Sequence, residues 1–178
     1  MIHELLLLEF NEEAKKTRAM LERVPMKADF KPHAKSMPLG KLAMHVATLP
    51  IFGKTILTTP GLNLADPASK WPDQTFRTRE LALATFDAAS ADCRAALAPL
   101  SDAELATPWK FSFGEHVISN SPRSLAYRHM CFNHLLHHRA QLSVYLRLND
   151  IPVPGLYGPS ADEPFDPAAA VKRAAAHA

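Results

Sequence analysis

Residues 128–141 read RHMCFNHLLHHRAQ and lie inside a run from Arg123 to Ile151 that contains neither glycine nor proline. Such a run predicts a helix. On a helix, His134 and His138 are four residues apart, so they lie about 40° apart around the axis and about one turn along it. Their imidazoles therefore project from one face, where both can bind one metal ion, whereas His137 points about 100° away from His138.

Apolar side chains on the same side of this helix predict that the two histidines face the core. These side chains are Tyr127, Cys131, Leu135, Leu142, Tyr145 and Leu146. An inward pair of histidines is either a hydrogen-bonded core feature or a pair of metal ligands, and a third inward histidine favours the metal. Zinc proteases with this spacing carry a catalytic glutamate directly after the first histidine, but Leu135 stands there, which excludes that class.

The composition is that of an ordinary globular domain. The chain has 178 residues, of which 47% are hydrophobic, and its net charge is +2 with no basic cluster, so we expect no nucleic-acid binding. The two cysteines form no CxxC pair, which is compatible with a reduced, cytoplasmic setting. The leucines at 5–8 are too short a run for a secretory signal, and no stretch is long enough to span a membrane.

Hydrophobic periodicity predicts four long helices, at residues 2–24, 38–49, 78–97 and 121–148. The apolar stripe of the first consists of Leu6, Phe10, Ala14, Thr17, Leu21 and Val24. In the second, Leu42, His45, Val46 and Leu49 share a face, and Pro50 is expected to end or kink the helix. Four amphipathic segments with no convincing sheet favour an all-α, single-domain four-helix bundle.

The connections are expected to be irregular at residues 58–75 and 149–160. Ser101-Asp102-Ala103-Glu104 matches a capping box and predicts one further helical turn. Residues 107–120 are expected to form an extended or hairpin-like excursion. We expect residues 1–163 to form the bundle and residues 164–178, which are rich in alanine, to form a tail.

A bundle of this kind brings side chains of different helices together, so the sequence predicts a site made of His45, His134 and His138. Three imidazoles suit Zn, Ni, Fe or Cu better than Mg or Ca. Three protein ligands also leave a coordination position open for water or a substrate, as in catalytic sites. A di-iron centre is not expected, because no inward Glu-x-x-His pair is present.

Three segments resemble the DinB-like (damage-inducible, YfiT-like) family of four-helix metalloproteins. They are SMPLGKLAMH at 36–45, NHLLHHRAQL at 133–142 and PVPGLYGPSAD at 152–162, and the resemblance covers about residues 2–163. It implies an up-down-down-up bundle, one divalent metal (Zn, Ni or Fe) on His45, His134 and His138, and a homodimer. The chain departs from the family at Ala140, where glycine is common, and at Pro38, where serine is common; neither is a ligand.

The resemblance leaves two functions open. In the first, the protein is a metal-dependent enzyme, a thiol-dependent S-transferase or isomerase or a hydrolase, that uses a low-molecular-weight thiol or an electrophile as substrate. In the second, it is a non-catalytic metal-binding stress-response protein whose ion is mainly structural. Removing the metal should abolish turnover more than stability in the first case, and the reverse in the second.

Several residues near the motif have an expected role. We expect Arg139 in a surface salt bridge or a dimer contact rather than at a substrate, and Gln141 either behind a ligand or on the polar surface. Cys131 and Tyr127 are expected in the core, the latter with a partner for its hydroxyl.

Three other residues are candidates for the mouth of the site. His116 and Glu115 are candidates to reach it, and Tyr157 is a candidate to fold the C-terminal segment over it. Four further histidines are expected at the surface: His3, His33, His129 and His177.

Overall fold

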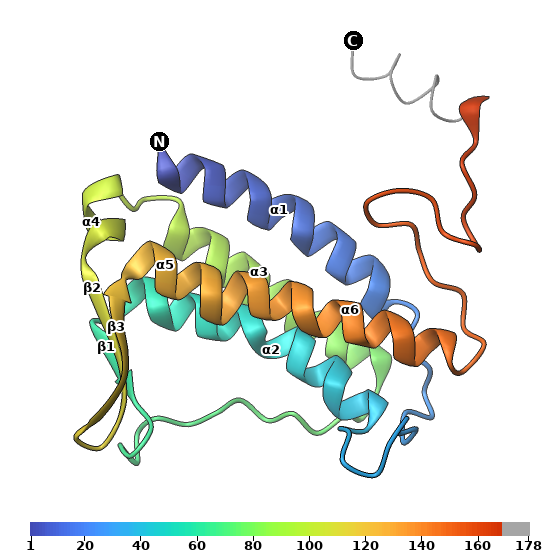
Figure 1. Ribbon diagram of the computed structural model, residues 1–178, viewed down its shortest axis with the longest axis horizontal. Coiled ribbons are helices and arrows are strands. Elements are labelled where there is room, and N and C mark those ends of the chain that lie inside the picture. Colours follow the sequence, from blue (N-terminus) through green and yellow to red (C-terminus); the bar gives the residue numbers. More distant parts are fainter. Residues whose placement is uncertain (169–178) are drawn as a thin grey trace.

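A computed structural model describes residues 1–168 as a mostly helical fold with one small sheet at one end (Figure 1). The elements are α1 (Ile2–Leu21), α2 (Leu39–Thr58), β1 (Gly61–Asn63), α3 (Arg79–Leu97), α4 (Asp102–Ala106), β2 (Pro108–Phe113), β3 (His116–Pro122), α5 (Arg123–Tyr127), the π-helical turn η1 (Arg128–Phe132) and α6 (Asn133–Arg147). Within residues 1–168, no helix is both long and apolar enough to cross a membrane.

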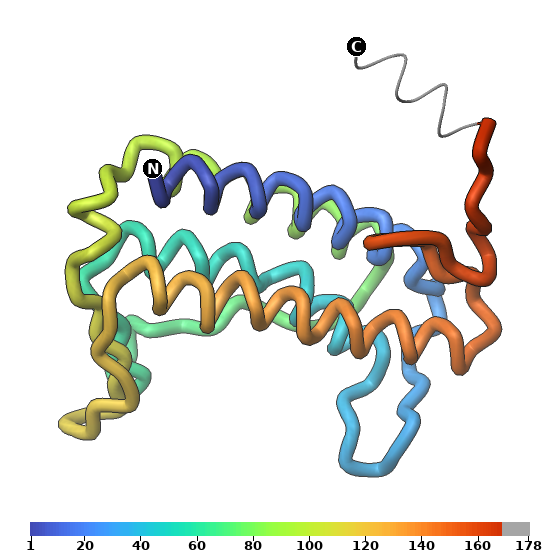
Figure 2. The backbone as a smooth tube through the Cα atoms, turned by 45° about the horizontal axis from the view of Figure 1, so that its top comes forward, coloured from blue at the N-terminus to red at the C-terminus, as the bar shows by residue number. Residues whose placement is uncertain are grey.

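The four long helical segments lie side by side, and α5, η1 and α6 form one continuous segment (Figures 1 and 2). α1 and the α5–α6 segment start at the end that carries the sheet, whereas α2 and α3 run toward it. α2 contacts α3 and α6, and α1 also contacts both. The core therefore lies between these four segments, and the predicted stripe of α1 is buried in it.

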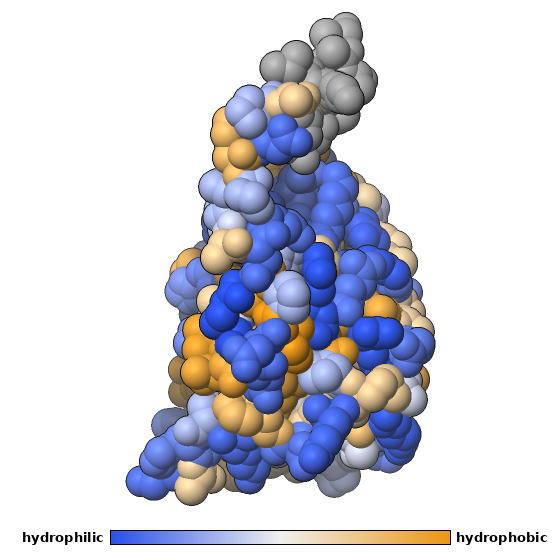
Figure 3. Space-filling view, turned by 90° about the vertical axis from the view of Figure 1, so that its right-hand side faces the viewer, coloured by the Kyte–Doolittle hydropathy of each residue, from blue (hydrophilic) through white to orange (hydrophobic). Residues whose placement is uncertain are grey.

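The opposite end of the helices is covered by the chain between α1 and α2 and by the segment after α6 (Figure 2). Seen from that end, the surface is largely hydrophilic, with a group of apolar residues near the middle (Figure 3). The segment after α6 is held by two ion pairs, Arg147 with Asp162 and Arg23 with Glu163. The predicted alanine-rich tail, 164–178, falls for the most part on residues 169–178, which lie outside the described residues.

The sheet corrects the expectation that the chain is all-α. The hairpin at 107–120 is confirmed as β2 and β3, but β1 pairs in parallel with β2, with Gly61 opposite Lys110. A Cβ at Gly61 would lie 2.5 Å from the Lys110 carbonyl oxygen, so the close approach requires glycine. β1 was missed because three residues that include glycine carry little strand signal, and their partner lies far along the chain.

The helix boundaries differ from the predicted ones at three places. α1 ends at Leu21, three residues early. α2 continues through Pro50 to Thr58, because the burial of Ile56 and Leu57 at about 1.5–3 kcal/mol each offsets the roughly 3 kcal/mol that an internal proline costs. The last helix contains a π turn at η1, which simple periodicity does not predict. The capping box at Ser101 and Glu104 is confirmed.

Candidate metal site

The structure brings the three predicted histidines together between α2 and α6. His45 lies in the first half of α2, and His134 and His138 lie one turn apart on α6. The Nε2 atom of His134 lies 3.3 Å from Nε2 of His45 and 2.8 Å from Nε2 of His138. Among the described residues, these three form a group whose ligand atoms all lie within 4.8 Å of one another.

Each of the three imidazoles has a second contact at Nδ1, on the side away from the group. Nδ1 of His138 lies 2.7 Å from the side-chain oxygen of Gln141, and Nδ1 of His134 lies 3.3 Å from the Met130 carbonyl oxygen. Nδ1 of His45 lies 2.9 Å from the side-chain nitrogen of Gln74, and a half-turn of this amide would put its oxygen at that place. An acceptor at Nδ1 holds the proton there and leaves the Nε2 lone pair directed at the group, which is the arrangement at His134 and His138 and, after that half-turn, at His45.

This arrangement fits a divalent transition metal. Two imidazole nitrogens about 2.0–2.1 Å from a tetrahedral ion lie about 3.3 Å apart, which is the separation of Nε2 of His45 and His134. Nε2 of His134 and His138, 2.8 Å apart, would separate by about 0.5 Å around such an ion. The imidazoles are also held neutral, as ligands must be. Burial, followed by the neighbouring imidazoles and Lys41, lowers the pKa of His45 to about 4, and burial is the main cause that lowers the pKa of His134 and of His138.

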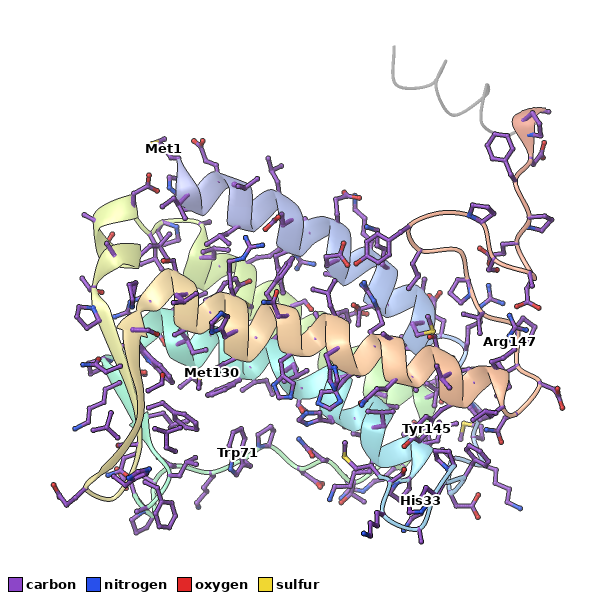
Figure 4. The ribbon with its side chains drawn as sticks, viewed as in Figure 1. Met1, His33, Trp71, Met130, Tyr145 and Arg147 are labelled. Atoms are coloured by element: carbon purple, nitrogen blue, oxygen red, sulfur yellow. The ribbon has the colours of Figure 1, made fainter. Side chains whose placement is uncertain are left out.

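A segment between β1 and α3, residues 69–77, crosses α2 beside His45, and we call it the strap. Its side chains alternate: Pro72, Gln74 and Phe76 are partly buried, whereas the residues between them are exposed. Figure 4 shows Trp71 on this strap, which runs beside α2 from the sheet toward the start of α3. A Cβ at Gly40 would lie 2.8 Å from Cβ of Phe76, so glycine lets the strap lie directly on α2.

Two hollows meet at His45 and are separated by the strap. The first is an open cleft of about 940 Å³ between the strap and the segment before α2, and its cationic side chains are Lys41 and Arg77. The second is a smaller slot of about 60 Å³ on the other side of Gln74, between the strap and α2. His45 is therefore reached from a cleft large enough for a small molecule, whereas His134 and His138 line neither hollow.

Sequence reasoning about Arg139 was wrong. Its side chain is only 2% exposed and pairs with Glu13 of α1 at 2.6 Å. It also donates to the carbonyl oxygen of Glu13 and to the hydroxyl of Thr17. The helical spacing correctly turns Arg139 away from His138, but α1 covers that side, so the residue is a buried link between two helices rather than a surface or dimer contact.

The candidates for the mouth of the site are also corrected. Tyr157 lies on the α1 side, where it shares a hydrogen-bond network with Glu13 and Arg139, so it does not cover the histidines. His116 and Glu115 lie at the tip of the β2–β3 hairpin and line neither hollow.

The remaining histidines follow their predictions in part. His33 and His129 are exposed, as expected. His3 is partly buried and contacts Asp102. His177 lies outside the described residues.

Cys131 and Tyr127 are core residues, as expected. Both are fully buried, and the Tyr127 hydroxyl has a partner in the Cys93 thiol, 3.8 Å away. Hydrogen bonding with Cys93 and burial raise the pKa of the Cys131 thiol, so it is held as the neutral thiol. Cys93, Tyr127 and Cys131 lie beside Gly53 of α2. A Cβ added at Gly53 would lie 2.6 Å from the Cys131 sulfur, so glycine allows this close packing.

Gln74 is the site residue that the sequence did not indicate. It belongs to an irregular segment that has no helical period, and it is 29 residues from His45. The one signal was the alternation of Pro72, Gln74 and Phe76, which puts these side chains on one side of an extended segment. Gln141, in contrast, is predicted from the sequence to lie either behind a ligand or on the polar surface, and its side chain contacts Nδ1 of His138.

An early helix and a late helix that together supply three converging imidazoles define a helical protein with a candidate metal site. The family model described as the DinB superfamily matches residues 9–142, about three quarters of the chain and all three histidines. The chain belongs to the DinB superfamily.

Among solved structures, the chain is similar to a DinB-like protein from Bacillus cereus ATCC 10987, with a TM-score of 0.60 and 21% identity over 85% of this chain and 95% of that one. At that identity the likeness concerns the fold. A comparison with curated proteins gives no match.

Proposed function

We propose that this protein is a metal-dependent enzyme in which His45, His134 and His138 hold one divalent transition metal ion, Zn, Ni or Fe. The observation that carries the proposal is the convergence of three Nε2 atoms, each on a ring whose Nδ1 has a hydrogen-bonding neighbour. Three neutral ligands leave room for a further ligand, and the cleft beside His45 gives a small molecule access to it.

When bound, such an ion supplies Lewis acidity, which lowers the pKa of a water or of a thiol. The residues of the chain do the rest. Gln74, Gln141 and the Met130 carbonyl hold the three rings in the binding orientation. Lys41 and Arg77 supply positive charge at the cleft. This combination supports thiol-dependent transfer or isomerisation, or hydrolysis, with a small thiol or electrophile as substrate.

The alternative is a non-catalytic protein, such as a stress-response protein, whose ion mainly stabilises the fold. One observation favours it: the ligands come from α2 and α6, so an ion would connect two helices that are far apart in the sequence. In that case the binding energy of the metal adds to the free energy of unfolding.

The two functions are separated by loading the protein with Co²⁺ and adding 2-mercaptoethanol. An enzyme with an open coordination position gives a new thiolate-to-cobalt absorption band, and the free energy of unfolding of the loaded protein changes little when the metal is removed. If the spectrum does not respond to the thiol and the protein loses most of its stability without metal, the structural role is correct. A protein that binds no Co²⁺ contradicts both.

We also propose an up-down-down-up bundle of residues 1–163 that forms a cytoplasmic homodimer. The helix directions in Figure 1 and the ion pairs of Asp162 and Glu163 support the first part. The exposed leucines at positions 5 and 8 of α1, with Ile2, supply an apolar surface for a second copy. Equilibrium sedimentation tests the dimer, and a monomer at micromolar concentration would contradict it.

A further inference from the structure

Three segments of the chain meet at Gly40, near the beginning of α2. The backbone N–H of Gly40 donates to the carbonyl oxygen of Ala28, 2.7 Å away. A Cβ added at Gly40 would lie 3.1 Å from Cβ of Ala28 and 2.8 Å from Cβ of Phe76. The chain before α2, α2 itself and the strap therefore touch one another here. This contact forms part of the wall of the open cleft, because all three residues line it.

The residue after each of these three is charged and lines the cleft: Asp29, Lys41 and Arg77. Consecutive Cα atoms are 3.8 Å apart, so the three charged residues leave the backbone close to the shared contact at Gly40. Three segments that are far apart in the sequence thus bring one carboxylate and two cations to one part of the cleft.

Two of these charges have no opposite charge beside them in the protein. None of the ion pairs within residues 1–168 includes Lys41 or Asp29, and both side chains are exposed. Arg77 pairs with Asp73 at 3.2 Å, but both partners are more than half exposed, and such pairs are weak. A molecule in the cleft therefore meets positive and negative groups that are available to it.

The cleft also offers an apolar surface. Met26, from the chain before α2, and Trp71, from the strap, line it and are 56% and 57% exposed. The Trp71 ring makes an edge contact with Phe52, with the ring centroids 5.5 Å apart, so the strap holds it against α2. The cleft, at about 940 Å³, thus combines apolar and charged groups at a size that is typical of small-molecule sites.

We propose that the open cleft binds an α-amino acid with an apolar side chain, or a small derivative that keeps both charged groups. Lys41, with Arg77 near it, binds the carboxylate, and Asp29 binds the ammonium group. Met26 and Trp71 contact the apolar side chain. A ligand with a carboxylate alone would leave Asp29 without a partner, and an amine alone would leave Lys41 without one.

The proposal goes beyond the metal-dependent function and does not rest on it. Of the three histidines, His45 alone lines the cleft. The amino acid is therefore placed beside His45, and none of its atoms is assigned to the metal. For this reason the test is made on protein from which a chelator has removed any metal.

The experiment titrates the chelator-treated protein with three probes that share one phenyl group. They are L-phenylalanine, 3-phenylpropionate, which lacks the ammonium group, and 2-phenylethylamine, which lacks the carboxylate. The indole N–H resonance of Trp71 reports binding. From the usual strength of ion pairs at exposed positions, L-phenylalanine should bind about 3- to 5-fold more tightly than either of the other two.

Two variants assign the charges. Lys41→Gln should weaken the binding of L-phenylalanine and 3-phenylpropionate by about the same factor and leave that of 2-phenylethylamine unchanged. Asp29→Asn should weaken L-phenylalanine and 2-phenylethylamine and leave 3-phenylpropionate unchanged. Both side chains are exposed, so the variants are expected to fold. The matched control is Lys54→Gln, because Lys54 is an exposed lysine of α2 that pairs with Asp92 and does not line the cleft.

Equal affinities for the three probes would overturn the proposal, and so would a preference for L-phenylalanine that survives both Lys41→Gln and Asp29→Asn. If 3-phenylpropionate binds as tightly as L-phenylalanine and Asp29→Asn has no effect, the cleft is an anion site and the amino-acid proposal is wrong. None of these outcomes depends on a metal, so a failure of the proposed function in the Co²⁺ experiment is a separate result.

Discussion

The contact between Gln74 and His45 predicts how strongly the strap controls metal binding. Gln74→Ala removes the neighbour at 2.9 Å from Nδ1 of His45, so the ring is free to rotate and to carry its proton on Nε2, where it cannot bind the metal. Among the three ligands, His45 depends most on its hydrogen-bond partner, because it is the one ligand on α2. His134 and His138 lie one turn apart on α6, so each is a neighbour of the other.

Loss of one such partner typically costs 10- to 100-fold in metal affinity, which corresponds to about 1.4–2.7 kcal/mol. We therefore expect the Kd for Zn²⁺, measured by competition with a chelating dye at constant pH, to rise by about 10- to 100-fold in Gln74→Ala. Circular dichroism should show an unchanged helical content, because Gln74 lies outside the helices.

Two variants serve as controls. Gln74→Glu keeps an acceptor for Nδ1 and should hold the Kd within a factor of about three of the parent protein. Thr75→Ala changes the next residue, which is exposed, and should leave the Kd unchanged. A Gln74→Ala protein that binds Zn²⁺ as tightly as the parent would refute the reasoning, and so would equal losses in all three variants, since these would point to a general disturbance of the strap.

Three further outcomes concern stability. Arg139→Met removes the buried ion-pair partner of the Glu13 carboxylate and should lower the free energy of unfolding in urea by about 2–4 kcal/mol. Arg147→Met, at an exposed pair, should lower it by at most about 1 kcal/mol, and equal losses would contradict the burial of Arg139. Burial opposes ionisation of Glu13, but hydrogen bonds from Lys16, Tyr157 and Arg139 leave its pKa below 4.5. The ionised Glu13 side chain therefore adds to the free energy of unfolding above about pH 4.5, and this contribution is lost as the pH falls through the lowered pKa. The slope of stability against pH in that range should be smaller in Arg139→Met; an unchanged slope would show that Glu13 is not the group responsible. Gly40→Ala places a Cβ 2.8 Å from Cβ of Phe76 and should lower the free energy of unfolding by about 1–3 kcal/mol. Because the strap is displaced, Zn²⁺ should also bind more weakly. Unaltered stability and Zn²⁺ affinity would show that the position of the strap does not depend on this contact.

The parts of the fold that the sequence predicts are those with a local period. The helical stripe of α1 and the inward pair on α6 follow from spacings of three and four residues; the structure buries the stripe, and the two histidines are half-buried and turned toward α2. The capping box and the hairpin carry their own local signals, at Ser101 and around Gly114. Each of these elements is decided by residues that are close in the sequence.

What the sequence does not reveal depends on neighbours that are far along the chain. Helical spacing predicts that Arg139 points away from His138 but not that α1 covers it, so the sequence alone predicts a surface charge where the structure has a buried one. β1 exists because β2 lies beside it, and Gln74 reaches His45 because Phe76 packs on Gly40. In each case the decisive contact joins segments that have no common period.

Metal content is the most direct test of the three-histidine site. The protein is stripped with a chelator, reloaded with Zn²⁺ and analysed for metal beside His45→Ala and the matched control His137→Ala, whose side chain is exposed on the same helix. We predict one ion per chain in the parent and in His137→Ala, and loss of the ion in His45→Ala with the helical content retained. A His45→Ala protein that is folded and still binds one ion per chain with the affinity of the parent would contradict the site.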